Sequence, residues 1–327
     1  MADLPAARVN QCSPFASTAV DYAGYFWYKS GMTRRAPITK CYVAVFKCMV
    51  TGAIHLEVVT DLSTNAFLAA LDRFVSRRGL CHEMFSDNGK NFEGANNELM
   101  KVVHSQSLEV AQWCCAKNIK WRFTAPMAPH AGGIYESAVK SMKHHLNRLL
   151  VARYTLEQMS TLLCKIEAVL NSRPLTALSS DPNDLEALTP GHFLIGRALV
   201  GRPTQLLLDV PSNRLQYWSG LQQVHQEFWK SWYSDYLKTL QTRPCKFRNL
   251  VSYKVDDLVL LMENNVPPMK WLLGRISGIL RSKGDIPRVV TVRTKSGLKQ
   301  RQVQYLCPLP SFDESFPPGD CVAEQRA

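Results

Sequence analysis

The first half of the chain alternates short apolar runs with stretches of helical periodicity. Apolar runs bounded by turn residues predict strands at 17–26, 40–50, 53–60 and 119–123, and Met84-Phe85 predicts another. Helical periodicity fills much of the sequence between and after these runs. This order of elements indicates an α/β domain.

Several predicted helices have clear start and stop signals. A helix beginning at Asp61–Thr64 has Ser63 or Thr64 as its cap and Gly79 as its terminator. Thr155 and Gln158 form a capping box for a helix that ends before Pro174. In sequence order, the predicted helices span 64–78, 94–117, 134–151, 156–171 and 214–241. The aromatic spacing in the last of them favours a packed helix over a base-stacking surface.

The composition changes in the second half. Residues 172–213 are rich in proline, serine and aspartate and predict an irregular connector. From 241 to 310 there are thirteen Lys or Arg and four Asp or Glu, so this segment supplies nine of the twelve net positive charges. Short β patterns in the same segment predict a small barrel. The sequence pI near 9.3 favours a polyanionic partner, of which nucleic acid is the commonest.

Cysteine usage and hydropathy suggest a soluble protein of the cell interior. The ten cysteines include no C-x-x-C pair, which favours reduced thiols over a disulfide framework. His144-His145 lacks cysteine partners at the spacing of a structural zinc site. The first residues contain no apolar signal segment, and the apolar runs are far shorter than the roughly 20 residues of a membrane span.

Three acids are the candidate catalytic residues. Asp21 lies inside a predicted apolar strand, Asp87 follows a strand at an Asn-Gly turn, and Glu136 lies one turn into a predicted helix. An acid within an apolar strand is costly unless it is hydrogen-bonded, paired or bound to a cation. Three carboxylates brought together would repel one another, and two Mg²⁺ ions would resolve that repulsion. Such ions clamp the attacking and leaving oxygens of a phosphoryl displacement.

Each acid also has a simpler explanation. Asp87 could belong to a common tight turn, Glu136 could be a helix first-turn acid, and Asp21 could be a satisfied buried acid. Glu57 and Asp61 compete with Asp21 as ligands, and Asp61 fits better as a helix-start residue. These alternatives stay open on the three positions alone.

The surrounding motifs resemble a known family. The order Asp…Asp…Glu, with SDNGKNF around the second acid and APHAGGIYESAVKSMK around the third, resembles retroviral-type integrases. The chain is also similar to integrases of BEL/Pao LTR retrotransposons in several local segments. These segments are ADLPAARV, VDYAGYF, FSDNGKNFEGANNEL, IEAVLNSRPLT, LTPGHFLIGRAL and DLVLLMENNVPPMKWLLGRISGIL. The resemblance covers residues 3 to 310, roughly.

The resemblance implies an α/β, ribonuclease-H-like mixed sheet flanked by helices, then a helical connector and a small Src-homology-3-like barrel. The implied activity is metal-dependent 3′ processing and strand transfer of DNA, a polynucleotidyl transferase or endonuclease reaction. Asp21, Asp87 and Glu136 would hold two Mg²⁺ or Mn²⁺ ions. The partners would be element ends and target DNA, with a homo-oligomer on DNA, no membrane, and nuclear function after cytoplasmic synthesis. The implied parts are a lead-in (1–14), core (15–175), connector (176–244), barrel (245–310) and tail (311–327).

Basic residues around the acids and in the tail are candidate DNA contacts. Lys140 and Lys143 lie one and two turns beyond Glu136 on its helix face, which could equally be a solvated face. His130 fits a loop cap better than a DNA contact. The full predicted DNA-binding set is Lys90, Lys140, Lys143, Arg275, Lys283 and Arg293.

Some features depart from the family pattern. The spacing between Asp87 and Glu136 is 48 residues (136 − 87 − 1), longer than in retroviral enzymes. Lys90 stands where a small hydroxyl residue is usual, and Ala131 replaces a common aromatic. The zinc-binding His/Cys arm that precedes the core in the family is not found in this sequence. The rival expectation is therefore a domesticated, catalytically silent DNA-binding or interaction protein.

Overall fold

A computed structural model describes most of the chain, which forms two compact units. The described residues are 10–33, 35–104, 119–123, 142–149, 154–211, 214–241, 253–281 and 287–310. Unit 1 comprises Met1–Ser172, Pro190–Tyr233 and Pro267–Met269, and unit 2 comprises Arg173–Thr189, Ser234–Val266 and Lys270–Ala327. The domain boundaries inferred from the sequence stay a prediction.

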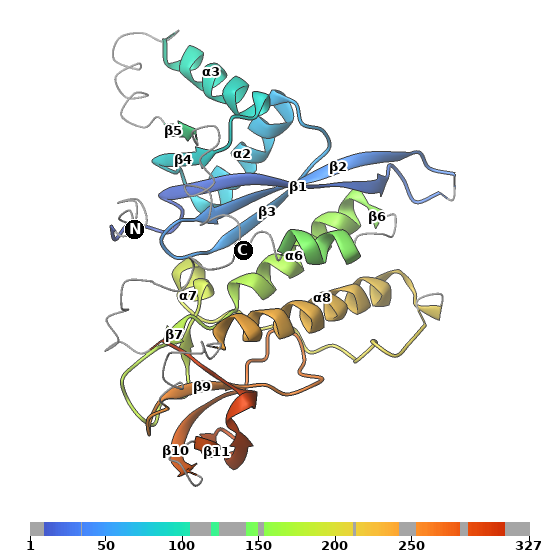
Figure 1. Cartoon of the computed structure of the whole chain (residues 1–327). Helices are drawn as coiled ribbons and strands as arrows, with labels where there is room; N and C mark the ends of the chain where they lie inside the picture. The colour runs from blue at the N-terminus through green and yellow to red at the C-terminus, as the bar shows by residue number, and fades with distance from the viewer. Residues whose placement is uncertain are drawn as a thin grey trace, which may run out of the picture. The chain divides into compact units, whose positions relative to one another are not determined.

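Unit 1 is built on a mixed sheet with the strand order β3-β2-β1-β4-β5 (Figure 1). β1, β2 and β3 are antiparallel, whereas β4 and β5 run parallel to β1. The short strand β6 pairs with the far end of β1. This mixed sheet flanked by helices is the α/β class that the sequence pattern predicts and the ribonuclease-H-like arrangement that the resemblance implies. The strands are β1 (Ser17–Lys29), β2 (Ile38–Cys48), β3 (Ile54–Val59), β4 (Glu83–Ser86), β5 (Lys120–Phe123) and β6 (Tyr154–Thr155).

The helices of unit 1 begin where their capping signals predict. α2 (Thr64–Arg78) has Ser63 as its N-cap, whose side chain accepts a hydrogen bond from the backbone N–H of Ala66, and it ends at Gly79 with a φ of 90°. α6 (Leu156–Asn171) starts with both hydrogen bonds of the Thr155–Gln158 capping box. Both cap predictions are therefore confirmed. The other helical segments of unit 1 are α3 (Lys90–His104), 142–149 and α7 (Pro190–Ile195).

Aromatic side chains fill the core between the sheet and the helices α2 and α3. The rings of Phe46 from β2 and Phe74 from α2 stack with centroids 4.3 Å apart. Phe67 meets the edge of Phe92, which α3 supplies, at 4.9 Å. Burial of such rings, with their paired geometry, is the main apolar contribution to this layer.

On the opposite side of the sheet, α6 packs against the edge strand β3. The side-chain amide of Asn171 accepts a hydrogen bond from the backbone N–H of Ile54 (2.8 Å) and donates one to the carbonyl of the same residue (2.7 Å). Glu167 accepts a hydrogen bond from the backbone N–H of Leu56 at 2.9 Å. These side chains satisfy backbone groups of β3 that no further strand pairs with.

The long helix α8 (Tyr217–Leu240) contains the aromatic residues predicted to pack. Within unit 1, Phe228, Trp229 and Trp232 are buried, which confirms the core interpretation for these residues. Tyr217 and Trp218, at the start of the helix, remain exposed.

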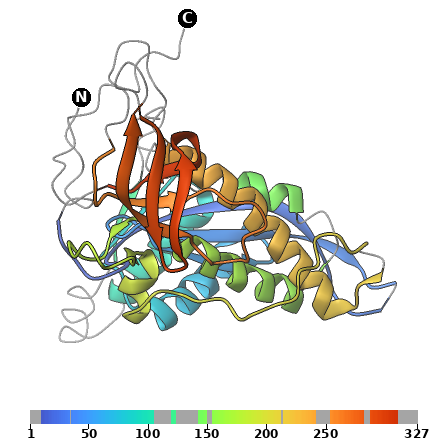
Figure 2. The same ribbon diagram turned by 90° about the horizontal axis from the view of Figure 1, so that it is seen from below.

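Unit 2 contains a five-stranded antiparallel sheet with the order β12-β11-β10-β9-β13 (orange to red in Figure 2). Its apolar core includes Val259, Ile276, Val290, Val292 and Leu306. The sheet has the barrel-like form expected from the sequence. The elements are β7 (Thr176–Ala177), β8 (Ala187–Leu188), β9 (Leu258–Leu261), β10 (Leu273–Arg281), β11 (Pro287–Thr294), β12 (Gly297–Gln302), the 3₁₀ turn Val303–Tyr305 and β13 (Leu306–Pro308).

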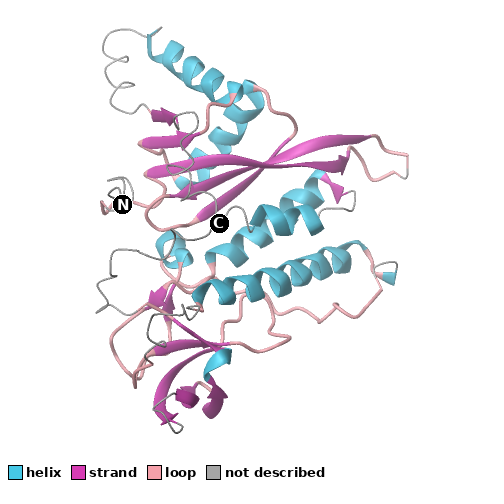
Figure 3. Cartoon of the chain, in the orientation of Figure 1, coloured by secondary structure: helices cyan, strands magenta, loops and turns pink. Residues whose placement is uncertain are grey.

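The predicted connector at 172–213 is not wholly irregular. It includes the two-stranded pair β7–β8 and the short helix α7 (Figure 3). Within the described ranges, every helix is too short or too polar to cross a lipid bilayer.

Candidate functional site

Asp21 lies in the middle of the sheet, on β1. It pairs with Val45 of β2, and 39% of its side chain is exposed. Its Oδ1 accepts a hydrogen bond from the backbone N–H of Tyr22 at 2.7 Å, and its Oδ2 accepts one from Lys143 Nζ at 2.5 Å. The acid inside an apolar strand is therefore balanced by a cation.

Asp87 directly follows β4 and is exposed. Its Oδ1 accepts a hydrogen bond from the backbone N–H of Gly89 at 3.1 Å, which forms the local turn expected from the Asn-Gly sequence. A Cβ at Gly89 would lie 2.9 Å from Asn91 Oδ1 and 3.2 Å from Asp87 Oδ1, so glycine suits this close approach. Lys90 is exposed in the first turn of α3, three residues beyond Asp87.

The parallel pairing of β1 and β4 relates the two acids. Its register matches Ser17 with Glu83, Thr18 with Met84 and Ala19 with Phe85. β4 ends at Ser86, so Asp87 follows the paired segment, and Asp21 lies two residues beyond Ala19, the last residue of β1 that pairs with β4. Adjacent strands lie about 4.8 Å apart, so the two acids belong to neighbouring strands of one sheet or to the turn that follows one.

The third predicted acid, Glu136, lies outside the described residues, as do Lys140, His130 and Ala131. Lys143 belongs to the described helical segment 142–149, which is part of the helix predicted at 134–151. Among the described residues, no group of three His, Cys, Asp or Glu could hold a metal ion. The three-acid constellation therefore stays a prediction.

The two placed carboxylates fit the ligand chemistry of a hard cation. Both are accessible, and the Asp21 carboxylate already attracts one ammonium group, that of Lys143. Carboxylate oxygens with room for water are what Mg²⁺ prefers. Among the residues that the structure describes, neither acid has a set of arginine partners that would neutralise it permanently.

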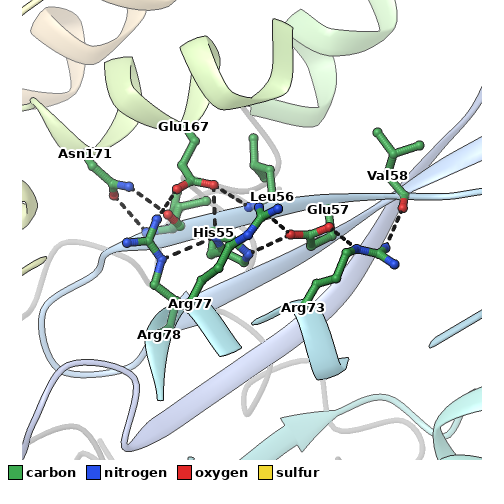
Figure 4. A network of polar contacts seen from close by, with 10 residues as sticks. His55, Leu56, Glu57, Val58, Arg73, Arg77, Arg78, Glu167 and Asn171 are labelled. Carbon is green, nitrogen blue, oxygen red and sulfur yellow. Dashed lines mark hydrogen bonds and ion pairs between the residues drawn. The ribbon is translucent and has the colours of Figure 1, made fainter. Parts of the chain in front are cut away.

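Glu57, a competing ligand in the sequence, has such a set (Figure 4). Only 6% of its side chain is exposed. Its Oε2 accepts a hydrogen bond from Arg73 Nε at 2.6 Å, and its Oε1 accepts one from Arg77 at 3.0 Å and contacts His55 Nε2 at 3.1 Å. Glu57 is therefore a structural acid.

The same network continues through His55 to α6. His55 Nδ1 lies 3.1 Å from Glu167 Oε2, and Arg78 pairs with the other oxygen of Glu167. Burial alone would lower the pKa of His55, but its hydrogen bonds to Glu167 and Glu57 raise the pKa above its ordinary value. Burial alone would raise the pKa of Glu57, but hydrogen bonds from His55 and Arg73 lower it overall.

Sequence reasoning missed this network, although two signals were available. His55 and Glu57 alternate on one face of a strand, and Arg73 and Arg77 are one turn apart on a helix. For Asp61 the helix-start interpretation is confirmed, because its Oδ1 accepts a hydrogen bond from the backbone N–H of Ser63 at 2.8 Å.

Two of the basic residues expected to contact DNA lie in unit 2 with partners of their own. Arg275 is only 6% exposed and donates to the carbonyl oxygens of Ser179, Asp184 and Asp256. This position corrects the expectation for Arg275, because a buried guanidinium bonded to three carbonyls is not available to phosphates. Arg293 is partly exposed and donates to Asn183 Oδ1 at 3.2 Å, while Lys283 lies outside the described residues.

The chain is similar to one protein family in part of its sequence and to solved structures over more of its length. A family of unknown function, DUF5641, matches residues 216–309, which hold α8 and the five-stranded sheet. The search of curated proteins gives no match. A structure of the simian T-cell lymphotropic virus intasome, in complex with PP2A regulatory subunit B56 gamma, is 12% identical over 91% of this chain and 80% of that chain, with a TM-score of 0.38.

A second structure is the HTLV-2 integrase catalytic core domain in complex with magnesium, in a trimeric form. It is 16% identical over 57% of this chain and 99% of that chain, with a TM-score of 0.33.

Proposed function

We propose that this chain is an integrase-type polynucleotidyl transferase derived from a BEL/Pao-like LTR retrotransposon. It would process the 3′ ends of element DNA and join them to target DNA in the nucleus. The observation that supports the proposal is the parallel pairing of β1, which carries Asp21, with β4, which leads directly to Asp87, within one mixed sheet. The motifs around these acids resemble the same family.

In this proposal, Asp21, Asp87 and Glu136 would hold Mg²⁺ or Mn²⁺. Such ions supply an activated water or 3′-hydroxyl and stabilise the charge that develops on the phosphate. The chain's own basic residues would orient the DNA. The ion pair of Lys143 with Asp21 and the exposure of Lys90, three residues after Asp87, support a role for both ammonium groups in contacting phosphate oxygens.

A second candidate function is a catalytically silent DNA-binding protein. The observation that favours it is the ion pair between Lys143 and Asp21. In this pair the Lys143 ammonium occupies the place at the carboxylate that a metal ion would need. The net charge of +12 would then serve binding alone.

One experiment separates the two functions. The purified 327-residue chain is incubated with supercoiled plasmid and with element-end duplexes in Mn²⁺, beside the variant Asp87→Asn. The matched control is Asp72→Asn, since Asp72 is an exposed acid on α2. The transferase function predicts nicking by the unaltered chain and by the control, and none by Asp87→Asn.

Other outcomes decide against the transferase. If the unaltered chain and both variants bind DNA in a salt-dependent way and none of them nicks it, the silent binding function is established. Equal nicking by Asp87→Asn and the unaltered chain would reject the carboxylate site. Failure to bind DNA at all would reject both functions.

A further inference from the structure

The far end of the β1–β2 hairpin presents two exposed aromatic rings beside a lysine. Tyr25 is 54% exposed and Trp27 is 42% exposed. Their ring centroids are 5.6 Å apart at an interplanar angle of 85°. Lys40, from the partner strand, places its ammonium 4.5 Å from the Tyr25 centroid and 5.7 Å from the Trp27 centroid. We call Tyr25, Trp27 and Lys40 the hairpin face.

A β-bulge at Gly24 sets which residues make up this face. The register of β1 against β2 shifts between Ala23 and Phe26, and Gly24 has a φ of 110°. A Cβ at Gly24 would lie 2.8 Å from the Phe26 ring. One extra residue reverses the alternation of the strand. Phe26 and its partner Cys41 are consequently buried on one side, and the aromatic pair lies on the open side.

The hairpin face also lies where the sheet narrows. β3 pairs with β2 only from Tyr42 to Lys47, so the residues of β2 before Tyr42 extend beyond it. β4 pairs with β1 only at Ser17–Ala19. Figures 1 and 3 show the two strands continuing as a ribbon past β3. β6 pairs with β1 just beyond this face, at Tyr28 and Lys29, whereas the rings of Tyr25 and Trp27 themselves are exposed.

Charge indicates what this face binds. Between Asp21 and Glu57 the sequence has five Lys or Arg and no Asp or Glu. Rings kept only for packing would be buried, as Phe26 is. Large exposed rings with cations and without nearby acids in sequence are the composition of surfaces that stack bases and hold phosphates.

We propose that the hairpin face binds single-stranded DNA, with bases stacked on Tyr25 and Trp27 and phosphates held by Lys40 and the exposed Arg35. A duplex keeps its bases stacked internally, so it would offer phosphates to this face but no free base. Trp27 is six residues along β1 from Asp21, or about 20 Å at strand spacing, and by the register of β1 against β2 it lies on the opposite face of the sheet from Asp21. The hairpin face is therefore a site separate from the two acids. The inference rests on the proposed function for its choice of DNA as partner.

The test is binding of a fluorescein-labelled oligothymidylate to the full chain, measured by anisotropy in EDTA. Trp27→Ala should weaken binding by about tenfold, within the range found for loss of one stacked base. Trp27→Phe should restore most of the affinity, and Lys40→Gln should weaken binding and reduce its salt dependence. The matched control is Trp218→Ala, because Trp218 is 45% exposed and also has two cations nearby, Lys165 at 4.8 Å and Arg202 at 5.4 Å.

Three results would overturn the proposal. The first is unchanged affinity in Trp27→Ala, or an equal loss in Trp218→Ala. The second is an equal loss for a duplex of the same length, which would make the face a general phosphate contact. The third is displacement of the oligonucleotide by polyglutamate at equal concentration, which would assign the face to acidic polypeptides.

The test also separates this site from the catalytic proposal. Binding in EDTA needs no metal, so Asp87→Asn should bind the oligothymidylate like the unaltered chain. If Asp87→Asn still nicks DNA, the proposed function fails while the hairpin result stands. If Trp27→Ala binds normally while Asp87→Asn loses nicking, the hairpin inference alone fails.

Discussion

The sheet of unit 1 carries two groups of acids with opposite surroundings. On β3, Glu57 is enclosed and holds His55, Arg73 and Arg77. On β1, Asp21 is part-exposed, and within the described part of the chain its partners are the Lys143 ammonium and a backbone N–H. Both acids lie in apolar strands, so sequence position does not separate them. The number of permanent cation partners distinguishes the two acids.

That difference has a physical meaning. A buried carboxylate with several hydrogen-bonded cations is stabilising only as a complete set, and removing one member leaves uncompensated charge. An accessible carboxylate with one mobile partner can exchange that partner for another cation. We therefore expect changes in the β3 network to affect stability, and changes at Asp21 to affect activity.

The largest expected effect is the loss of activity in Asp21→Asn. Nicking in Mn²⁺ should fall by more than about a hundredfold, beyond the loss seen when groups behind a metal ligand are changed. The free energy of unfolding in urea should change little, because the pair with Lys143 is partly exposed. Glu57→Gln should show the reverse pattern. Matching activity losses in the two variants would remove the distinction between the two groups.

The next effect is on stability. Glu167→Ala removes the acceptor for Leu56 N–H and the partner of Arg78 and His55. We expect the free energy of unfolding to fall by about 3 kcal/mol, the lower end for breaking a buried pair. Glu98→Gln, which breaks an exposed pair with Lys101, is the control and should change it by less than about 1 kcal/mol. Urea denaturation of both variants tests this, and similar midpoints would contradict it.

Two arginines of unit 2 show the same contrast between a buried charged group with several partners and a partly exposed one. Arg275→Ala leaves three carbonyl oxygens without their donor and should cost about 2 kcal/mol in urea denaturation. Arg293→Ala should leave stability almost unchanged but reduce the salt dependence of duplex binding. A stable Arg275→Ala with weaker DNA binding would reinstate Arg275 as a DNA contact.

A smaller effect follows from the pKa of His55. This pKa is raised in the folded chain, so the stability it contributes is present below pH 6.5, the ordinary value, and is lost as the pH rises through the folded pKa. The slope for one proton is at most about 1.4 kcal/mol per pH unit. Urea denaturation of the unaltered chain between pH 6 and pH 9, as rough limits, should show the free energy of unfolding falling as the pH rises. The His55→Asn variant, measured in the same way, should lack this fall. Parallel curves would show that His55 does not titrate in this range.

Local signals were the part of the structure that the sequence predicted well. The caps at Ser63 and Thr155 depend on residues within three positions of each other, and both form as predicted. α3 begins at Lys90, earlier than the predicted 94, because Gly94 is not a helix break. A Cβ at Gly94 would lie 2.3 Å from Thr64 Oγ1, so this glycine permits close packing with the start of α2.

Contacts between distant residues were the part that the sequence did not predict. Glu167 meets the backbone of Leu56 across 111 positions, and Arg275 meets Asp184 across 91. No periodicity encodes such pairs, so the sequence does not reveal the β3 network, and it predicts a DNA contact at Arg275. The family resemblance predicts that Asp21 and Asp87 act together, and the structure adds that β1 and β4, the strands that carry and precede them, are neighbours in the sheet.

The smallest effect concerns the ammonium that balances Asp21. Lys143→Gln should lower the metal-free stability by less than about 1 kcal/mol, because both side chains are partly exposed. Without its competitor, the Asp21 carboxylate should bind a cation more tightly. Mn²⁺ should then raise the melting temperature of Lys143→Gln more than that of the unaltered chain, since stabilisation grows with ligand concentration relative to Kd. Lys101→Gln, which breaks the exposed pair with Glu98, should match the unaltered chain. A smaller Mn²⁺ shift in Lys143→Gln would mean that Lys143 supports the metal site, and no Mn²⁺ shift in any variant would exclude Asp21 as a metal ligand.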